Sequence, residues 1–137
     1  MKLLTLVRHA KSSWSNFDLS DHDRSLKNVG VKRTNKVVSY LIEYGLMPEL
    51  ILSSTAKRAL DTAKIIAGGI GYNIDNIIAK KSIYHADTDD IYHESYLVFK
   101  ENYESELTTI KADYDTDEDG TIDDSEEKLS NQVVLVK

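Results

Sequence analysis

Apolar residues along the chain form short continuous runs separated by longer stretches of helical spacing. The runs Leu3–Val7, Leu50–Ser53 and Gln132–Val136 are long enough for strands, and Ile77–Ala79 is a shorter piece that predicts an edge element. A run that is apolar throughout is typical of a strand covered on both faces. We therefore expect Leu3–Val7 to be a buried first strand.

Two helices are predicted between the first three runs. Apolar positions recur at helical spacing from Val31 until Gly45 ends the segment, and Pro48 separates it from the next strand. A second helix is expected over about Ala56–Ala67, with the pair Gly68-Gly69 as its stop.

A third helix is predicted from Asp89 to about Asn102, with Asp87 or Thr88 as its cap. Strands that alternate with helices are typical of an α/β fold. We expect a mainly parallel sheet with helices on both faces.

The composition indicates a single soluble domain over residues 1–137. Of the 137 residues, 41% are hydrophobic and 29% are charged, which is the balance of a globular protein. No run approaches the ~18 apolar residues of a membrane span, and the first residues do not form a signal peptide. We expect a cytoplasmic protein. The absence of cysteine excludes disulfides, thiolate metal sites and cysteine-phosphatase chemistry.

Charge divides the chain into two unlike parts. Residues 1–100 contain 14 Lys and Arg against 11 Asp and Glu, whereas residues 101–137 contain 3 against 12. The acidic end would repel phosphate backbones. We expect neither a nucleic acid nor a membrane as partner.

The most informative motif lies at the end of the first predicted strand, where Arg8 and His9 are adjacent within Leu6–Ser12. Parallel sheets place their chemistry at the carboxyl ends of strands. An imidazole can act as nucleophile, and a guanidinium can hold an oxyanion with two donors. Arg58, at the start of the second predicted helix, and Ser12 would supply further donors.

A second polar group follows in the loop Asp21–Leu26. Asp21 and Arg24 are candidates for contact with the substrate, and a carboxylate there would also orient His9. The alternative is that Asp21, Asp23 and Arg24 form a salt bridge that anchors the loop. His22 is interpreted as a surface residue.

The motifs Leu6–Trp14, Asp23-Arg24, Ser53-Ser54 and Ala56–Ala59 resemble the histidine phosphatase superfamily, and within it the SixA-type phosphohistidine phosphatases. The resemblance covers roughly residues 1–100. It implies a phosphoglycerate mutase-like fold and a phosphatase that needs no metal. His9 would be the residue that is phosphorylated, and Arg8 and Arg58 would be phosphate ligands. The substrate would be a phosphohistidine protein or a small phosphorylated molecule.

The chain departs from the family pattern at its C-terminal end. The family's second catalytic histidine lies in a Gly-His-Asn-Pro-like motif that follows a late strand. The segment Asn131–Val136 resembles that strand. The sequence contains no Gly-His pair. We expect a fold that is incomplete at the C-terminus, and either a phosphatase that acts through His9 or a catalytically impaired phosphate- and calcium-binding remnant. His85 and His93 are the histidines that could replace the second one, but His93 is expected in the middle of a helix and His85 at a turn, which disfavours both.

Residues 115–126 match a calcium-binding EF-hand loop. Gly120 occupies the sharp turn and Ile122 the apolar eighth position. The expected ligands of a structural Ca²⁺ are Asp115, Asp117, Asp119, Thr121 through its carbonyl, Asp123 and Glu126. The alternative is a solvated acidic loop. This motif lies in an expected insertion, at about residues 111–130, in a surface connection of the family fold.

Overall fold

The computed structural model describes residues 3–113 and 132–137 of the chain. The described strands form one four-stranded sheet in the order β1-β4-β2-β3, and every pairing is parallel. The strands are β1 (Leu3–Val7), β2 (Leu50–Ser54), β3 (Ile78–Lys80) and β4 (Gln132–Val136). The predicted strands are confirmed, and β3 lies at an edge.

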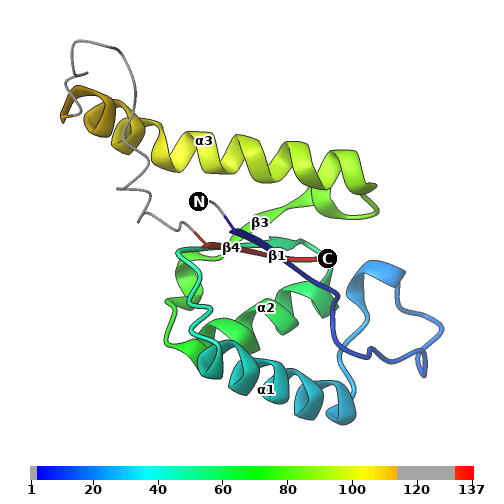
Figure 1. Cartoon of the computed structure of the whole chain (residues 1–137). Helices are drawn as coiled ribbons and strands as arrows, with labels where there is room; N and C mark the ends of the chain where they lie inside the picture. Colours follow the sequence, from blue (N-terminus) through cyan, green and yellow to red (C-terminus); the bar gives the residue numbers. More distant parts are fainter. Residues whose placement is uncertain (1–2, 114–131) are drawn as a thin grey trace.

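Within the described ranges three helices cover the sheet, α1 and α2 on one face and α3 on the other (Figure 1). They are α1 (Asn28–Glu43), α2 (Lys57–Ile70) and α3 (Thr88–Asp113), and three short 3-10 turns, η1 (Asp21–Asp23), η2 (Ile74–Asn76) and η3 (Lys81–Ile83), lie in the connections. The α/β prediction, with helices on both faces, is therefore confirmed.

Alternate residues of the central strands β2 and β4 belong to two hydrophobic cores, one on each face of the sheet. Ile51 of β2 and Val134 and Val136 of β4 pack toward α1 and α2. Leu52 and Leu135 point to the opposite face, where they meet α3. Because successive side chains of a strand point to opposite faces, an apolar run is what a sheet covered on both sides requires.

The expected end of the second helix is wrong. Gly68 and Gly69 lie inside α2, and the helix ends at Ile70. Gly71 caps it, with a φ of 77° that is the left-handed conformation typical of a helix cap. A Cβ on Gly69 would lie 2.5 Å from Val38 of α1. The glycine therefore allows close packing of the two helices instead of stopping α2.

Two further expectations need correction. β1 is not buried, since Leu3, Leu4 and Leu6 are 39, 37 and 60% exposed. In the described sheet β1 is an edge strand, and it pairs only with β4. α3 continues to Asp113, beyond the expected end near Asn102, because the sequence offers no glycine or proline to stop it.

Only the last residues of α3, 111–113, reach the insertion expected at about 111–130. The EF-hand-like residues 115–126 lie outside the described residues. Among the residues that the structure describes, none of the helices combines the length and apolarity needed to cross a bilayer.

Candidate active site

The Arg8-His9 pair lies where β1 ends, next to the end of β4. The main-chain N–H of His9 donates to the carbonyl of Lys137 at 2.7 Å, and the N–H of Lys137 donates to Val7 at 3.0 Å. These bonds continue the parallel pairing of β1 and β4 beyond the strands. The backbone of His9 is thus held by the sheet itself.

The next residue is fixed to α2 by a buried threonine. The N–H of Ala10 donates to Thr62 Oγ1 at 3.0 Å, and the same hydroxyl donates to the carbonyl of Arg58 at 2.6 Å. Thr62 is 1% exposed. One hydroxyl therefore joins the loop that contains His9 to the helix that contains Arg58.

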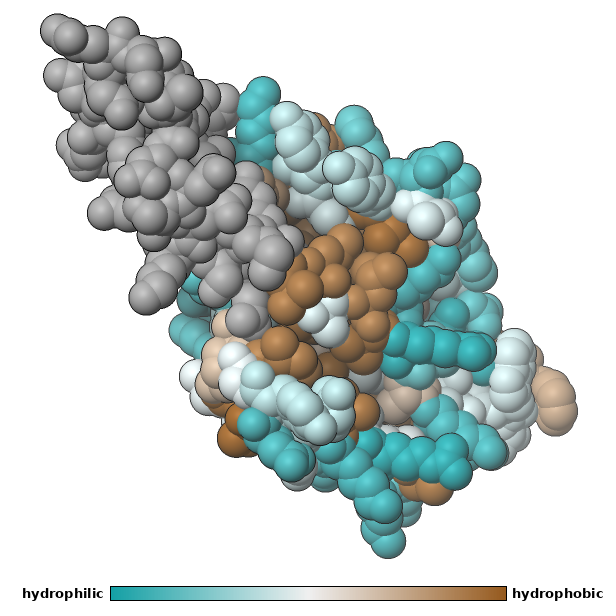
Figure 2. All heavy atoms as spheres, in the orientation of Figure 1, coloured by the Kyte–Doolittle hydropathy of each residue, from teal (hydrophilic) through white to brown (hydrophobic). Residues whose placement is uncertain are grey.

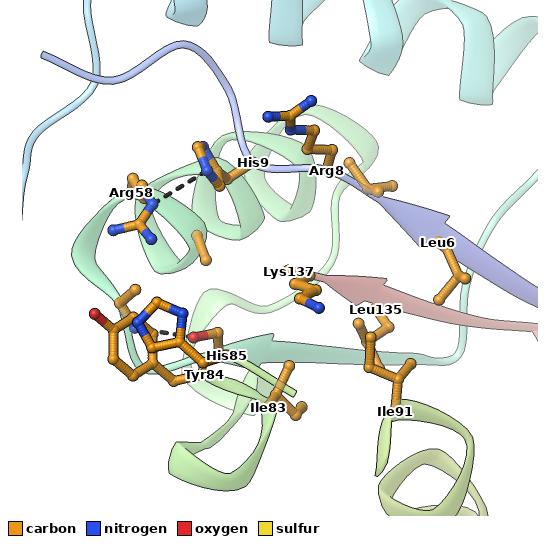
Figure 3. Close-up of a pocket in the computed structure, with 14 residues that line it drawn as sticks. Leu6, Arg8, His9, Arg58, Ile83, Tyr84, His85, Ile91, Leu135 and Lys137 are labelled. Carbon is orange, nitrogen blue, oxygen red and sulfur yellow. Dashed lines mark hydrogen bonds between the residues drawn. The ribbon is translucent and has the colours of Figure 1, made fainter. Parts of the chain in front are cut away.

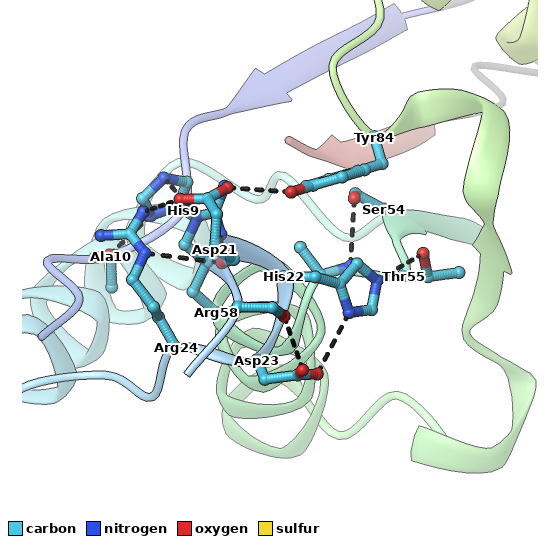
Figure 4. Close-up of polar contacts among 12 residues, drawn as sticks. His9, Ala10, Asp21, His22, Asp23, Arg24, Ser54, Thr55, Arg58 and Tyr84 are labelled. Carbon is cyan, nitrogen blue, oxygen red and sulfur yellow. Dashed lines mark hydrogen bonds and ion pairs between the residues drawn. The ribbon is translucent and has the colours of Figure 1, made fainter. Parts of the chain in front are cut away.

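The His9 imidazole is held through both nitrogens (Figures 3 and 4). Nδ1 lies 2.7 Å from the carbonyl of Ala10 and must donate to it, so the proton of the neutral ring is on Nδ1. Nε2 then carries the lone pair and accepts from Arg58 Nε at 3.1 Å. A histidine in this tautomer presents an unprotonated nitrogen, as a nucleophile requires.

The electrostatic surroundings of His9 also favour its neutral, Nε2-unprotonated form. Burial lowers the pKa of the imidazole, and the positive charges of Arg58, Arg8 and Arg24 lower it further, against the opposing effect of the hydrogen bond to Ala10. The pKa of His9 lies below its ordinary value of 6.5. The ring is neutral at physiological pH.

Arg58, in the first turn of α2, is buried and held by Asp21 (Figure 4). Its Nη1 donates to the Asp21 carbonyl, and its Nη2 forms an ion pair with Asp21 Oδ2 at 3.0 Å. The same carboxylate pairs with Arg24 at 2.8 Å and accepts from the Tyr84 hydroxyl at 2.9 Å. Asp21 thus orients the guanidinium that faces His9.

Asp21 is held in its charged form. Burial alone would raise the pKa of its carboxyl, but the Tyr84 hydrogen bond and the charges of Arg58 and Arg24 outweigh burial and lower the pKa. Arg24 itself is buried and lies 3.5 Å from the centre of the Trp14 ring. The salt bridge that the sequence offered as an alternative is therefore present between Asp21 and Arg24.

A pocket of about 340 Å³ opens beside these groups (Figure 3). Arg8, His9 and Arg58 all line it, so the three residues predicted to be catalytic come together. The exposed guanidinium of Arg8 makes no hydrogen bond or ion pair with any described residue, which leaves its donors available to a ligand.

Ser12, Asp21 and Arg24 do not line the pocket. Ser12 is buried and forms an isolated bridge with Leu26, while Asp21 and Arg24 act on Arg58 rather than facing the cavity. Direct contact of these three residues with a substrate stays a prediction.

Of the remaining histidines His22, His85 and His93, only His85 lines the pocket. His85 lines the pocket and has a φ of 61°, a backbone conformation that a residue with a side chain adopts at a cost. His93 is exposed on α3 and does not line the pocket. His22 lies in the 3-10 turn η1, where its Nε2 is 3.0 Å from the Thr55 hydroxyl.

Sequence reasoning missed two residues that hold the candidate site together, Thr62 and Tyr84. Thr62 lies four residues after Arg58 and so one turn along the same helical face, a spacing that would have identified it. Tyr84 carried no signal of this kind, because its contact with Asp21 spans 63 positions. Within the described part of the chain, no group of three or more His, Asp and Glu side chains is placed to hold a metal ion.

Comparison with known proteins agrees with this geometry. Residues 4–120 match the family model of the histidine phosphatase superfamily, branch 1. An uncharacterized chloroplastic protein of Arabidopsis thaliana is 48% identical over 61 residues, which are 44% of this chain and 28% of that protein. The chain thus spans little more than a quarter of that relative.

Solved SixA structures have the same fold. A SixA structure from Agrobacterium tumefaciens matches with a TM-score of 0.61 and 23% identity, over 97% of this chain and 66% of that one. The protein histidine phosphatase SixA in complex with tungstate matches with a TM-score of 0.68 and 12% identity, over 98% and 67%. The chain therefore spans about two thirds of these structures.

Proposed function

The chain belongs to branch 1 of the histidine phosphatase superfamily, and on that premise we propose that it is a phosphatase that works through phosphorylation of His9. Its substrate is a phosphohistidine protein or a small phosphorylated molecule. The observation that carries the proposal is the unprotonated His9 Nε2, which faces Arg58 in a pocket that Arg8 also lines.

The chemistry begins with attack of the His9 Nε2 lone pair on phosphorus. A P–N bond forms as the P–O or P–N bond to the leaving group breaks, and the leaving group takes up a proton from solvent. Water then attacks the phosphorus of phospho-His9, the P–N bond breaks, and one proton of the water returns to solvent, which releases inorganic phosphate and restores the neutral ring. Arg8 and Arg58 neutralise the charge of the phosphoryl oxygens in both steps.

Arg58 can bind phosphate without releasing Asp21. A guanidinium has five N–H groups, of which three are used here: Nε toward His9 and one on each terminal nitrogen toward Asp21. Two N–H groups remain for phosphoryl oxygens. The bond from Nε to His9 must break when Nε2 attacks, because one lone pair cannot serve both.

A second candidate function is a phosphate- and calcium-binding protein with little turnover. A phosphate site that has one charge-stabilising donor fewer typically turns over ~10²–10³ more slowly. The EF-hand-like ligands from Asp115 to Glu126 supply the calcium part of this alternative.

The test is covalent labelling with a small radioactive phosphodonor. The wild type should acquire an acid-labile, base-stable label, because phosphohistidine has that stability, and His9→Ala should acquire none. His93→Ala removes an exposed histidine outside the pocket and should label like the wild type. Equal labelling of His9→Ala would exclude His9 as nucleophile. A label that forms and does not turn over would favour the second candidate.

A further inference from the structure

The pocket beside His9 has two chemically different sides (Figure 3). One is cationic and polar, with Arg8, His9 and Arg58. The other is formed by the side chains of Leu6, Ile83, Ile91 and Leu135, which come from β1, η3, α3 and β4. A ligand that fills the pocket therefore meets arginines at one end and hydrocarbon at the other.

Three of the four apolar side chains belong to the hydrophobic core, and the fourth, Leu6, is exposed. Ile83 and Leu135 are fully buried and Ile91 nearly so, and all three belong to the core beneath α3. Leu6 is 60% exposed. Figure 2 shows apolar surface in the middle of the view, where β1 crosses the front of the sheet in Figure 1. Exposed hydrocarbon next to an anion site offers free energy to a ligand that covers it.

The charges on the pocket also select its ligand. None of the described residues that line it is acidic, while Lys137 and His85 lie with the two arginines on its border. The four apolar side chains have no hydrogen-bonding group. The hydroxyls of a sugar or polyol phosphate would lose water there without gaining a partner, which is unfavourable.

From these observations we propose that the pocket selects phosphorylated substrates whose leaving group is an apolar or aromatic ring, which would cover the exposed side chain of Leu6 where it lies beside the buried Ile83, Ile91 and Leu135. This inference rests on the proposed function, because the phosphoryl group must sit at Arg8 and Arg58 for the ring to reach the apolar side. A volume of about 340 Å³ lies within the range of small-ligand sites and suits one ring with its phosphoryl group.

The test compares three anions by titration calorimetry on the full 137-residue chain. Inorganic phosphate probes the anion end alone. Methylphosphonate and phenylphosphonate carry a P–C bond that cannot be hydrolysed, so their affinities are independent of turnover. We expect phenylphosphonate to bind about tenfold more tightly than methylphosphonate, the gain typical of one partly buried ring.

Two matched variants locate the ring. Leu6→Ser should remove most of the phenyl advantage and leave phosphate affinity unchanged, whereas Leu3→Ser alters an exposed leucine of the same strand outside the pocket and should keep the advantage. Binding of phosphate with equal affinities for the two phosphonates would overturn this inference alone, as would a full phenyl advantage in Leu6→Ser. Failure of phosphate itself to bind would overturn the proposed function, and this inference with it.

Discussion

The hydroxyl of Thr62 offers a direct test of how the His9 loop is held. In Thr62→Val the side chain keeps its shape, but the N–H of Ala10 loses its 3.0 Å acceptor. Thr62 is almost fully buried, so water cannot easily replace it. An unsatisfied buried donor costs about 1–3 kcal/mol, and we expect a loss of ~2 kcal/mol in the free energy of unfolding. For a chain of this size that lowers Tm by roughly 8 °C.

Thr34→Val is the matched control. Thr34 is also a buried threonine inside a helix, and its hydroxyl donates to the Gly30 carbonyl four residues earlier in α1. A bond of this kind within a helix adds little stability. The control should change the free energy of unfolding by less than about 0.5 kcal/mol.

Urea denaturation measures both variants, and titration with inorganic phosphate measures the consequence for the site. Thr62→Val should weaken phosphate binding, because the loop that presents Arg8 and His9 is no longer fixed to α2. Equal stability of the two threonine variants, together with unchanged phosphate affinity, would show that Thr62 does not position His9.

Two further predictions concern protons and calcium. Folding lowers the pKa of His9 from 6.5, so as the pH falls the unfolded chain binds the imidazole proton before the folded chain does. The free energy of unfolding that His9 contributes above pH 6.5 should therefore be lost as the pH falls through the folded-state pKa. Urea denaturation at a series of pH values measures this pH dependence, which His9→Asn should reduce by the His9 contribution; an unchanged pH dependence in His9→Asn would contradict the prediction. Calcium should raise Tm more than magnesium does, and Glu126→Gln should greatly reduce the rise in Tm because it removes a bidentate ligand. If titration calorimetry detects no heat of binding at millimolar calcium, residues 115–126 are an acidic loop and not a calcium site.

The sequence was sufficient for the features that depend on local pattern. The strands were predictable because each run is mostly apolar, and the Arg8-His9 pair was predictable because it directly follows one of these runs. The convergence of His9 and Arg58 also follows from pattern, since the carboxyl ends of parallel strands meet at one edge of a sheet. His9 follows β1, and Arg58 lies in the first turn of α2, the helix that follows β2. The two strands end at the same edge of the sheet, although β4 lies between them.

Features that depend on sheet order and helix contacts were not readable. The exposure of β1 follows from its edge position, and no local pattern encodes the order β1-β4-β2-β3. Gly69 looked like a helix stop because glycine commonly ends helices, but its contact with Val38 of α1 decides its role. At β1 and at Gly69, tertiary packing therefore overrides what the local sequence pattern predicts.

The pKa of His9 and the orientation of Arg58 are parts of one arrangement. The Arg58 charge helps keep Nε2 unprotonated, yet a buried guanidinium would be costly without a counter-ion. Asp21 supplies that counter-ion from a loop 37 positions away, and Arg24 and Tyr84 hold Asp21 in turn. The loop therefore need not touch a substrate to matter for chemistry. By fixing Arg58, it determines whether the guanidinium and His9 Nε2 face each other beside the same pocket.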